Sequence, residues 1–188
     1  MASLFTDIVG QRPEEIESRS IDSLQWFQTN VRDIRRVPSS LLKENQNFVT
    51  RFELGKMYMF MYDAKTKDKL KYYDYFPITI CLKRYSTGFM GVNLHYLPIP
   101  LRIKLLDRLV DYSNNTKFDE STILDVDYKR LKNLREIKPT LKRYLAGQVK
   151  SQFRRIDADE FTVATLLPVQ NFKKASDAEV WRESRSMI

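Results

Sequence analysis

The chain has few of the residues that build metal and redox sites. Its 188 residues include one cysteine, Cys81, and one histidine, His95. A single cysteine excludes an intrachain disulfide, and these two residues cannot supply the four ligands of a structural zinc site. A lone cysteine is typical of proteins that fold in a reducing compartment such as the cytoplasm. We therefore expect neither a metal nor a cofactor.

Glycine and long apolar runs are also scarce. The five glycines are scattered along the chain, so no glycine-rich phosphate loop is present. No run approaches the roughly 18 apolar residues of a membrane span. The N-terminus has neither the basic nor the apolar region of a signal peptide. We expect no membrane partner.

Aromatic residues, in contrast, are plentiful, with ten tyrosines and eleven phenylalanines. Many fall in three short runs bounded by glycine, proline, aspartate or serine, a pattern typical of strands. These runs are Met57–Tyr62, Ile78–Leu82 and Phe89–Tyr96. In the first run, aromatic residues alternate with methionines, so both faces are apolar. This alternation predicts a central strand.

The predicted fold class is α+β, with a small antiparallel β-sheet or SH3-like barrel flanked by N-terminal and C-terminal helices. We expect the β core at residues 50–98 and helices at 20–36, 100–113 and 128–155. In the middle helix, Arg102, Lys104 and Arg108 are expected to face solvent.

Three parts of the chain are distinguished by composition. Residues 1–19 are expected to form an arm, 20–160 a single domain, and 161–188 a tail that is partly docked on it. Phe172 and Trp181 suggest this docking, because such large apolar side chains are unusual in a disordered tail.

Positive charge is concentrated in residues 128–155. The chain has a formal net charge of +8, yet this segment alone carries +9, with ten basic residues and the single acidic residue Glu136. Apolar residues then recur every fourth position from Leu141 to Phe153, which predicts a helix. Its opposite face would carry Arg143, Lys150 and Arg154.

Such a cationic ridge can contact phosphates without reading bases. The alternative is a solvated helix face with no partner. The candidate nucleic-acid-binding residues are Lys129, Arg130, Lys132, Arg135, Lys142, Arg143, Lys150, Arg154 and Arg155. The tyrosines of the central stretch could stack on unpaired bases, although at strand spacing such residues are more often part of a core.

Catalytic chemistry has little support. Asp127 with Glu136-Ile137-Lys138 mimics the carboxylates and lysine of metal-dependent nucleases, but the string is short and lies where a helix is expected. His95 is expected to be a structural histidine held by a hydrogen bond, not a catalytic one.

Three strings carry a resemblance to a known family. They are Gly-Lys-Met-Tyr-Met-Phe at 55–60, Tyr-Asp-Tyr-Phe-Pro at 73–77 and Gly-Phe-Met-Gly-Val-Asn-Leu-His-Tyr-Leu-Pro at 88–98. Over roughly residues 18–181 the chain resembles virion proteins of T4-like tailed bacteriophages, the DNA end-protector proteins. The last string is a family marker whose candidate structural residues are Gly88, Gly91, Asn93, His95, Tyr96 and Pro98.

The resemblance implies a non-enzymatic virion protein that binds packaged DNA near the genome end, at the head–tail junction, and protects it. The implied partners are DNA, contacted through its backbone whatever its sequence, and other virion proteins. It implies a location in the virion, with the host cytoplasm as the site of assembly, and is compatible with an oligomer imposed by virion symmetry. The alternative is a purely structural neck, tail or baseplate adaptor that makes protein–protein contacts.

Overall fold

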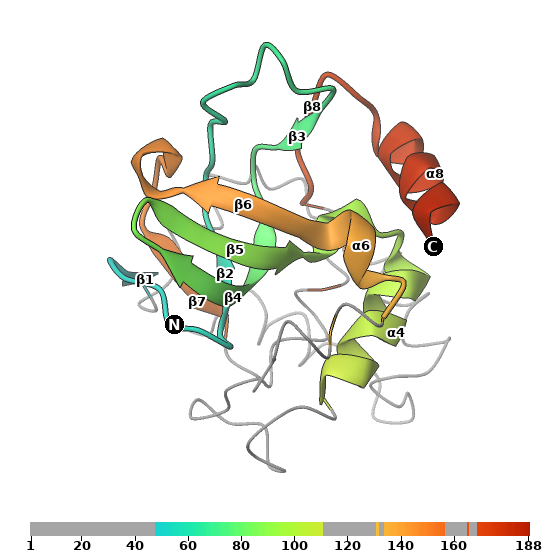
Figure 1. Cartoon of the computed structure of the whole chain (residues 1–188), viewed down its shortest axis with the longest axis horizontal. Coiled ribbons are helices and arrows are strands. Elements are labelled where there is room, and N and C mark those ends of the chain that lie inside the picture. Colours follow the sequence, from blue (N-terminus) through green and yellow to red (C-terminus); the bar gives the residue numbers. More distant parts are fainter. Residues whose placement is uncertain (1–47, 111–130, 132–133, 157–164, 166–168) are drawn as a thin grey trace, which may run out of the picture.

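The computed structural model describes residues 48–110, 131, 134–156, 165 and 169–188. The expected arm at 1–19 and helix at 20–36 lie outside these residues. Within them, six antiparallel strands form one sheet in the order β1-β7-β2-β4-β5-β6 (Figure 1). Their bounds are β1 Phe48–Val49, β2 Met57–Met59, β4 Ile78–Tyr85, β5 Gly88–Asn93, β6 Leu141–Leu145 and β7 Phe153–Ile156.

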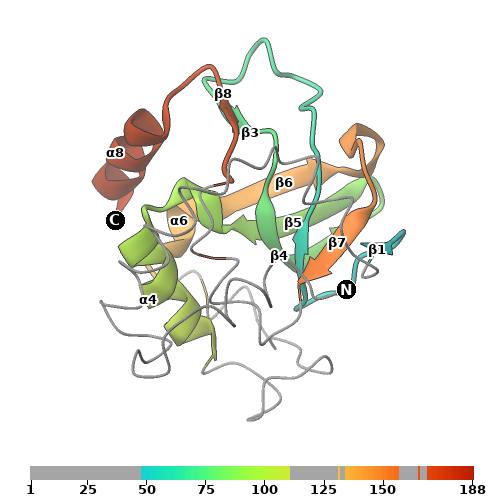
Figure 2. The same ribbon diagram turned by 180° about the vertical axis from the view of Figure 1, so that it is seen from behind.

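The remaining elements surround this sheet (Figure 2). A second, two-stranded sheet pairs β3 with β8. The bounds are β3 Tyr73–Asp74, β8 Phe172–Lys173, α4 Ile99–Val110, α6 Ile137–Thr140, α8 Asp177–Met187, and the short 3-10 helices η1 Leu94–Tyr96 and η2 Ala146–Gln148. None of these described helices combines the length and the apolar character needed to cross a membrane.

The α+β class is confirmed, but the SH3-like barrel is not. The sheet curls, so that Phe89 of β5 and Phe153 of β7 approach to 6.0 Å between ring centroids. Its edge strands β1 and β6 are not neighbours in the strand order, so the described strands form an open sheet.

The alternation in β2 divides the core in two, as expected for a central strand between β7 and β4. Met57 and Met59 are fully buried on the side where Leu105 and Leu109 of α4 pack. Tyr58 and Phe60 are buried in an aromatic cluster on the other side. Each such side chain contributes about 1.5–3 kcal/mol through burial.

The β4–β5 hairpin depends on two glycines. Its loop has two residues, because Tyr85 pairs with Gly88. Gly88 has φ +154°, and an added Cβ would collide with the carbonyl oxygen of Tyr144 on β6. At Gly91, a Cβ would collide with the Thr79 methyl group and lie 2.8 Å from the Ile80 carbonyl oxygen. Glycine therefore permits close approach of β5 to both neighbouring strands.

The third predicted strand ends earlier than expected. It stops at Asn93, and residues 94–96 form η1 instead of continuing the alternation. The cause is local, because the Asn93 side chain accepts a hydrogen bond from the backbone N–H of His95 and caps the turn.

The prediction for Arg102 is wrong. Helix α4 begins at Ile99, one residue before the predicted start, and Pro100 lies in its first turn, where proline is well tolerated. Arg102 is fully buried instead of facing solvent. Its guanidinium group donates to the carbonyl oxygens of Leu97 at 2.6 Å and Thr165 at 3.2 Å. It also lies 5.6 Å from the Trp181 ring, so the C-terminal segment covers it.

The predicted helix at 128–155 is also wrong over residues 134–155, and with it the confinement of the β core to residues 50–98. After the single turn of α6, the chain forms β6, η2 and β7. The four-residue apolar spacing misled the prediction because four is a multiple of the two-residue strand period as well as close to one helical turn.

The C-terminal segment packs on the domain through defined contacts. Strand β8 pairs with β3, placing Phe172 opposite Asp74. Helix α8 begins with a capping box in which the Ser176 and Glu179 side chains bond to each other's backbone N–H. The Trp181 indole N–H donates to the His95 carbonyl oxygen at 2.9 Å.

Candidate nucleic-acid interface

The structure separates the predicted nucleic-acid-binding residues instead of aligning them on one helix. Lys129, Arg130 and Lys132 lie outside the described residues. Arg135, Arg143 and Lys150 are exposed, whereas Lys142 and Arg155 are half-buried.

Arg154 is corrected most clearly. Its side chain is 1% exposed, because β7 places it opposite Met59 in the sheet. A side chain buried at that position cannot contact DNA phosphates, so the proposed ridge of Arg143, Lys150 and Arg154 does not exist.

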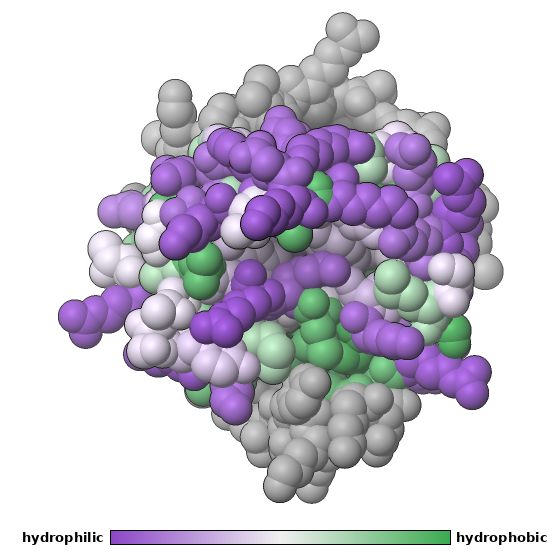
Figure 3. All heavy atoms as spheres, turned by 45° about the horizontal axis from the view of Figure 1, so that its top comes forward, coloured by the Kyte–Doolittle hydropathy of each residue, from purple (hydrophilic) through white to green (hydrophobic). Residues whose placement is uncertain are grey.

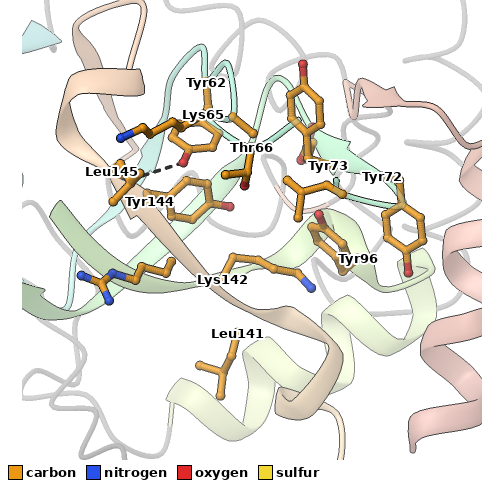
Figure 4. A pocket seen from close by; sticks show the side chains of 14 residues that line it. Tyr62, Lys65, Thr66, Tyr72, Tyr73, Tyr96, Leu141, Lys142, Tyr144 and Leu145 are labelled. Atoms are coloured by element: carbon orange, nitrogen blue, oxygen red, sulfur yellow. Dashed lines mark hydrogen bonds between the residues drawn. The ribbon is translucent and has the colours of Figure 1, made fainter. Parts of the chain in front are cut away.

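A cleft of about 450 Å³ lies between β6 and the loop that follows β2. Figure 3 views the molecule with its top turned forward; hydrophilic side chains dominate this face, which is hollowed near its centre. Tyrosines from several elements and two lysines line the cleft (Figure 4). These residues are Tyr62, Tyr72, Tyr73, Tyr96, Tyr144, Lys65 and Lys142. The volume is typical of pockets that hold one small molecule.

Strand β6 supplies the cleft's basic wall because its residues alternate. Lys142 and Tyr144 pair with Gly91 and Phe89, on the aromatic side of the sheet. Arg143 pairs with Met90 on the other side and donates to the Thr87 hydroxyl at 3.1 Å. Both residues line the cleft, but Lys142 points into it (Figure 4), whereas the Arg143 guanidinium group bonds to Thr87.

Lys142 is unusually placed for a lysine. Its Nζ lies 3.8 Å from the centre of the Tyr96 ring, a cation–π contact. Burial lowers the pKa of Lys142 from 10.5 to about 8, and the nearby Glu183 carboxylate only partly opposes this. No carboxylate in the described part of the chain forms a salt bridge with it. The cleft therefore contains a desolvated cation that an anionic ligand could neutralise.

The tyrosines surrounding this cation remain neutral at ordinary pH. Burial raises the pKa of Tyr72 to about 12 and also raises the pKa values of Tyr96 and Tyr144. Tyr62 and Tyr144 meet edge to face, with 4.9 Å between ring centroids, and the Tyr62 hydroxyl accepts the backbone N–H of Leu145. The cleft wall is therefore aromatic, uncharged and held in place.

A buried hydrogen-bond network fixes the cleft from beneath. The Asp74 carboxylate accepts bonds from His95 Nδ1 at 2.7 Å and from Asn93 Nδ2 at 3.0 Å. The same Asn93 amide donates to the Tyr144 hydroxyl at 3.0 Å. This network joins β3, β5 and β6, so the hydrogen bond expected for His95 is present and helps to position Tyr144.

The Asp74–His95 pair has a defined protonation state. Burial lowers the pKa of His95 despite the attraction of Asp74. Burial alone would raise the pKa of Asp74, but His95 and the surrounding donors hold it below its ordinary value. We infer a neutral imidazole beside an ionised carboxylate. A second ring proton would be unsatisfied, because His95 Nε2 has no hydrogen-bond partner among the described residues.

The loop over the cleft contributes one lysine that the sequence analysis did not select. Lys67 pairs with Asp63 at 2.9 Å and Lys71 pairs with Glu183 at 2.6 Å. Lys65 is exposed and lines the cleft. Four lysines in this short loop were the available signal, but the sequence does not show that the loop faces β6.

The nuclease interpretation receives no support from the described residues. The Glu136 carboxylate accepts from Arg108 at 2.9 Å and pairs with Lys104 at 3.3 Å, while Asp127 lies outside them. In the part of the chain that the structure describes, no group of three or more metal-ligating side chains occurs.

Comparison with known protein families now identifies the chain. The model of the phage T4 terminal DNA protecting protein family matches residues 7–184. The chain belongs to this family. The assignment confirms the resemblance, and with it a non-enzymatic phage protein that protects the terminal DNA of the genome. Association with packaged DNA implies a place in the virion. Searches of curated proteins and of solved structures found no match to this terminal DNA protecting protein.

Proposed function

We propose that the cleft face binds the phosphate backbone of the packaged DNA near its end, whatever the base sequence, and so protects the end at the head–tail junction. Lys65, Arg143 and Lys150 are the backbone contacts on this face. The observation that carries the proposal is the cleft itself, where the half-buried Lys142 faces neutral tyrosines beside the exposed Lys65 and Arg143. The exposed Lys150 is held nearby, because its backbone N–H donates to the carbonyl oxygen of Met61, one residue before Tyr62 of the cleft. Backbone contacts of this kind need positive charge but no base-reading side chain.

Salt dependence tests this proposal. Each phosphate contact releases counterions, so the logarithm of duplex affinity should fall with the logarithm of salt concentration by about 0.9 per contact. Substituting Lys65, Arg143 and Lys150 with glutamine should reduce the slope by up to roughly 3 and weaken binding equally for different sequences. Fluorescence anisotropy with labelled duplexes over a salt series measures both quantities.

A matched control separates this face from general charge. Arg51, Lys138 and Arg185 are exposed and do not line the cleft. Their triple glutamine variant removes the same net charge and should retain most of the slope. Equal slopes in the two triple variants would reject the cleft face as the DNA contact.

The second candidate function is a neck, tail or baseplate adaptor whose basic face meets acidic surfaces of other virion proteins. The loop over the cleft favours this adaptor function, because its lysines Lys67 and Lys71 contact protein carboxylates, those of Asp63 and Glu183. An adaptor would show no salt-sensitive binding to DNA, and the cleft-face variant would instead fail to assemble into particles.

A further inference from the structure

We propose that the tyrosine cleft is the binding site for one unpaired nucleotide at the DNA terminus, with the base stacked on a tyrosine ring and the phosphate at Lys142. The proposal rests on the proposed function and adds to it a site that recognises the end as such. Backbone contacts alone cannot do this, because they are the same along the whole duplex.

The size of the cleft selects one nucleotide over a duplex. Its volume of about 450 Å³ is in the range of roughly 300–1,000 Å³ that holds single small ligands. Lys65 and Thr66 of the loop line it across from Lys142 of β6 (Figure 4).

The aromatic lining divides into wall and platform. Tyr62, Tyr96 and Tyr144 are at most 7% exposed and serve as the wall. Tyr72 and Tyr73 are only partly buried, so their rings retain accessible surface within the cleft. An accessible ring can stack on any base, because every base has a π-face. Binding of this kind is tolerant of sequence, as a protein that protects genome ends requires.

Lys142 provides the anion-binding element. It points into the cleft from β6, beside the Tyr96 ring, and forms no salt bridge with a carboxylate in the described part of the chain. A phosphate would supply the counter-charge that this half-buried ammonium group lacks. Charge-assisted hydrogen bonds of this kind are the stronger ones.

These features distinguish an end from the middle of a duplex. Inside a duplex each base is stacked and paired, and its extrusion costs a few kcal/mol. An overhanging or frayed terminal base avoids that cost and can enter the cleft directly. Occupation would place the terminal nucleotide inside the protein, where an exonuclease cannot reach it.

The test compares DNA with and without ends. The full chain is titrated against a duplex with a short 3′ overhang, one with a 5′ overhang, a blunt duplex, and a dumbbell of the same length whose hairpin caps leave no terminus. We expect at least one overhang to bind about tenfold more tightly than the dumbbell, as the stacking of one base allows. The two overhangs identify which strand end enters.

Variants assign that preference to the cleft. Lys142→Gln and Tyr72→Leu should each bring the ratio of overhang to dumbbell affinity close to one, whereas Tyr72→Phe, which retains the ring, should preserve it. Lys150→Gln, at an exposed residue that does not line the cleft, should weaken both DNAs in parallel and leave the ratio unchanged. Circular dichroism checks that each variant is folded.

A second measurement does not depend on variants. A photoreactive 5-iodo-deoxyuridine at the terminal position should crosslink to Tyr72 or Tyr73, identified by mass spectrometry. Equal affinity for overhang and dumbbell, or crosslinks only to residues outside the cleft, would overturn the terminal-nucleotide site while leaving backbone binding intact. Absence of binding to every DNA would instead reject the proposed function.

Discussion

Replacing Lys142 with methionine should stabilise the folded protein while weakening its binding to DNA ends. Burial lowers the pKa of Lys142 from 10.5 to about 8, so the protonated side chain destabilises the fold at neutral pH. At about 1.36 kcal/mol per pKa unit, this shift corresponds to about 3 kcal/mol. The cation–π contact with Tyr96 offsets part of this destabilisation. We therefore expect Lys142→Met to raise the free energy of unfolding at pH 7 by about 1–3 kcal/mol.

The pH dependence of this gain identifies its cause. The folded-state pKa is the lower one, so between pH 8 and 10.5 the unfolded chain binds more protons at this site than the folded chain does. The stability contribution of Lys142 therefore rises with pH across that window. The advantage of Lys142→Met should accordingly shrink above pH 8 and be lost near pH 10.5. The neighbouring tyrosines do not interfere at the lower end of the window, since burial raises their pKa values.

Urea denaturation of wild type and variant, from pH 7 to 10.5, measures the difference directly. Lys65→Met is the matched control, because Lys65 is exposed, and it should change stability by no more than about 0.5 kcal/mol. A Lys142→Met protein that is less stable than wild type at pH 7, or whose advantage does not change with pH, would refute the reasoning.

Three further outcomes follow from the geometry. Gly91→Ala should cost about 1–3 kcal/mol in urea unfolding through overpacking against β4, whereas Gly147→Ala, whose added Cβ meets nothing within 4 Å, should not; equal costs would contradict this. Arg102→Leu should cost at least about 3 kcal/mol and expose the C-terminal helix to limited proteolysis, while Arg108→Leu, which leaves the buried Glu136 carboxylate paired with Lys104, should cost less, about 1–2 kcal/mol. The single histidine, His95, should titrate by NMR below 6.5, so that stability falls as pH drops below 6.5 toward this pKa; a value above 6.5 would show that Asp74 outweighs burial.

The sequence predicted the central strands well because their pattern has one interpretation. In residues 57–62, aromatic and methionine side chains alternate, and no helical arrangement sorts them into two separate apolar faces. The structure places them in two cores on opposite sides of β2. The proline and glycine residues that bound these runs, such as Pro77 and Gly88, were equally informative, because proline and glycine restrict or free the backbone directly.

Residues 141–153 could not be assigned in the same way. Leu141, Leu145, Val149 and Phe153 are four apart, and this spacing satisfies both a helix face and one face of a strand. Pairing of β6 with β5 decides between them, and that contact joins Gly91 to Lys142 across about fifty residues of chain. The prediction that Arg102 faces solvent was wrong for a similar reason, since its partners Thr165 and Trp181 lie far along the sequence.

The cleft depends almost wholly on such long-range contacts, yet the family strings contain part of its support. The string at 73–77 supplies Asp74, and the string at 88–98 supplies Asn93 and His95. By themselves they indicate no chemistry. In the structure they form the buried network that holds β3 against β5 and bonds to the Tyr144 hydroxyl beneath the cleft. The residues of the family strings therefore support the site without facing DNA themselves: through Tyr144 they hold β6, the strand that carries Lys142.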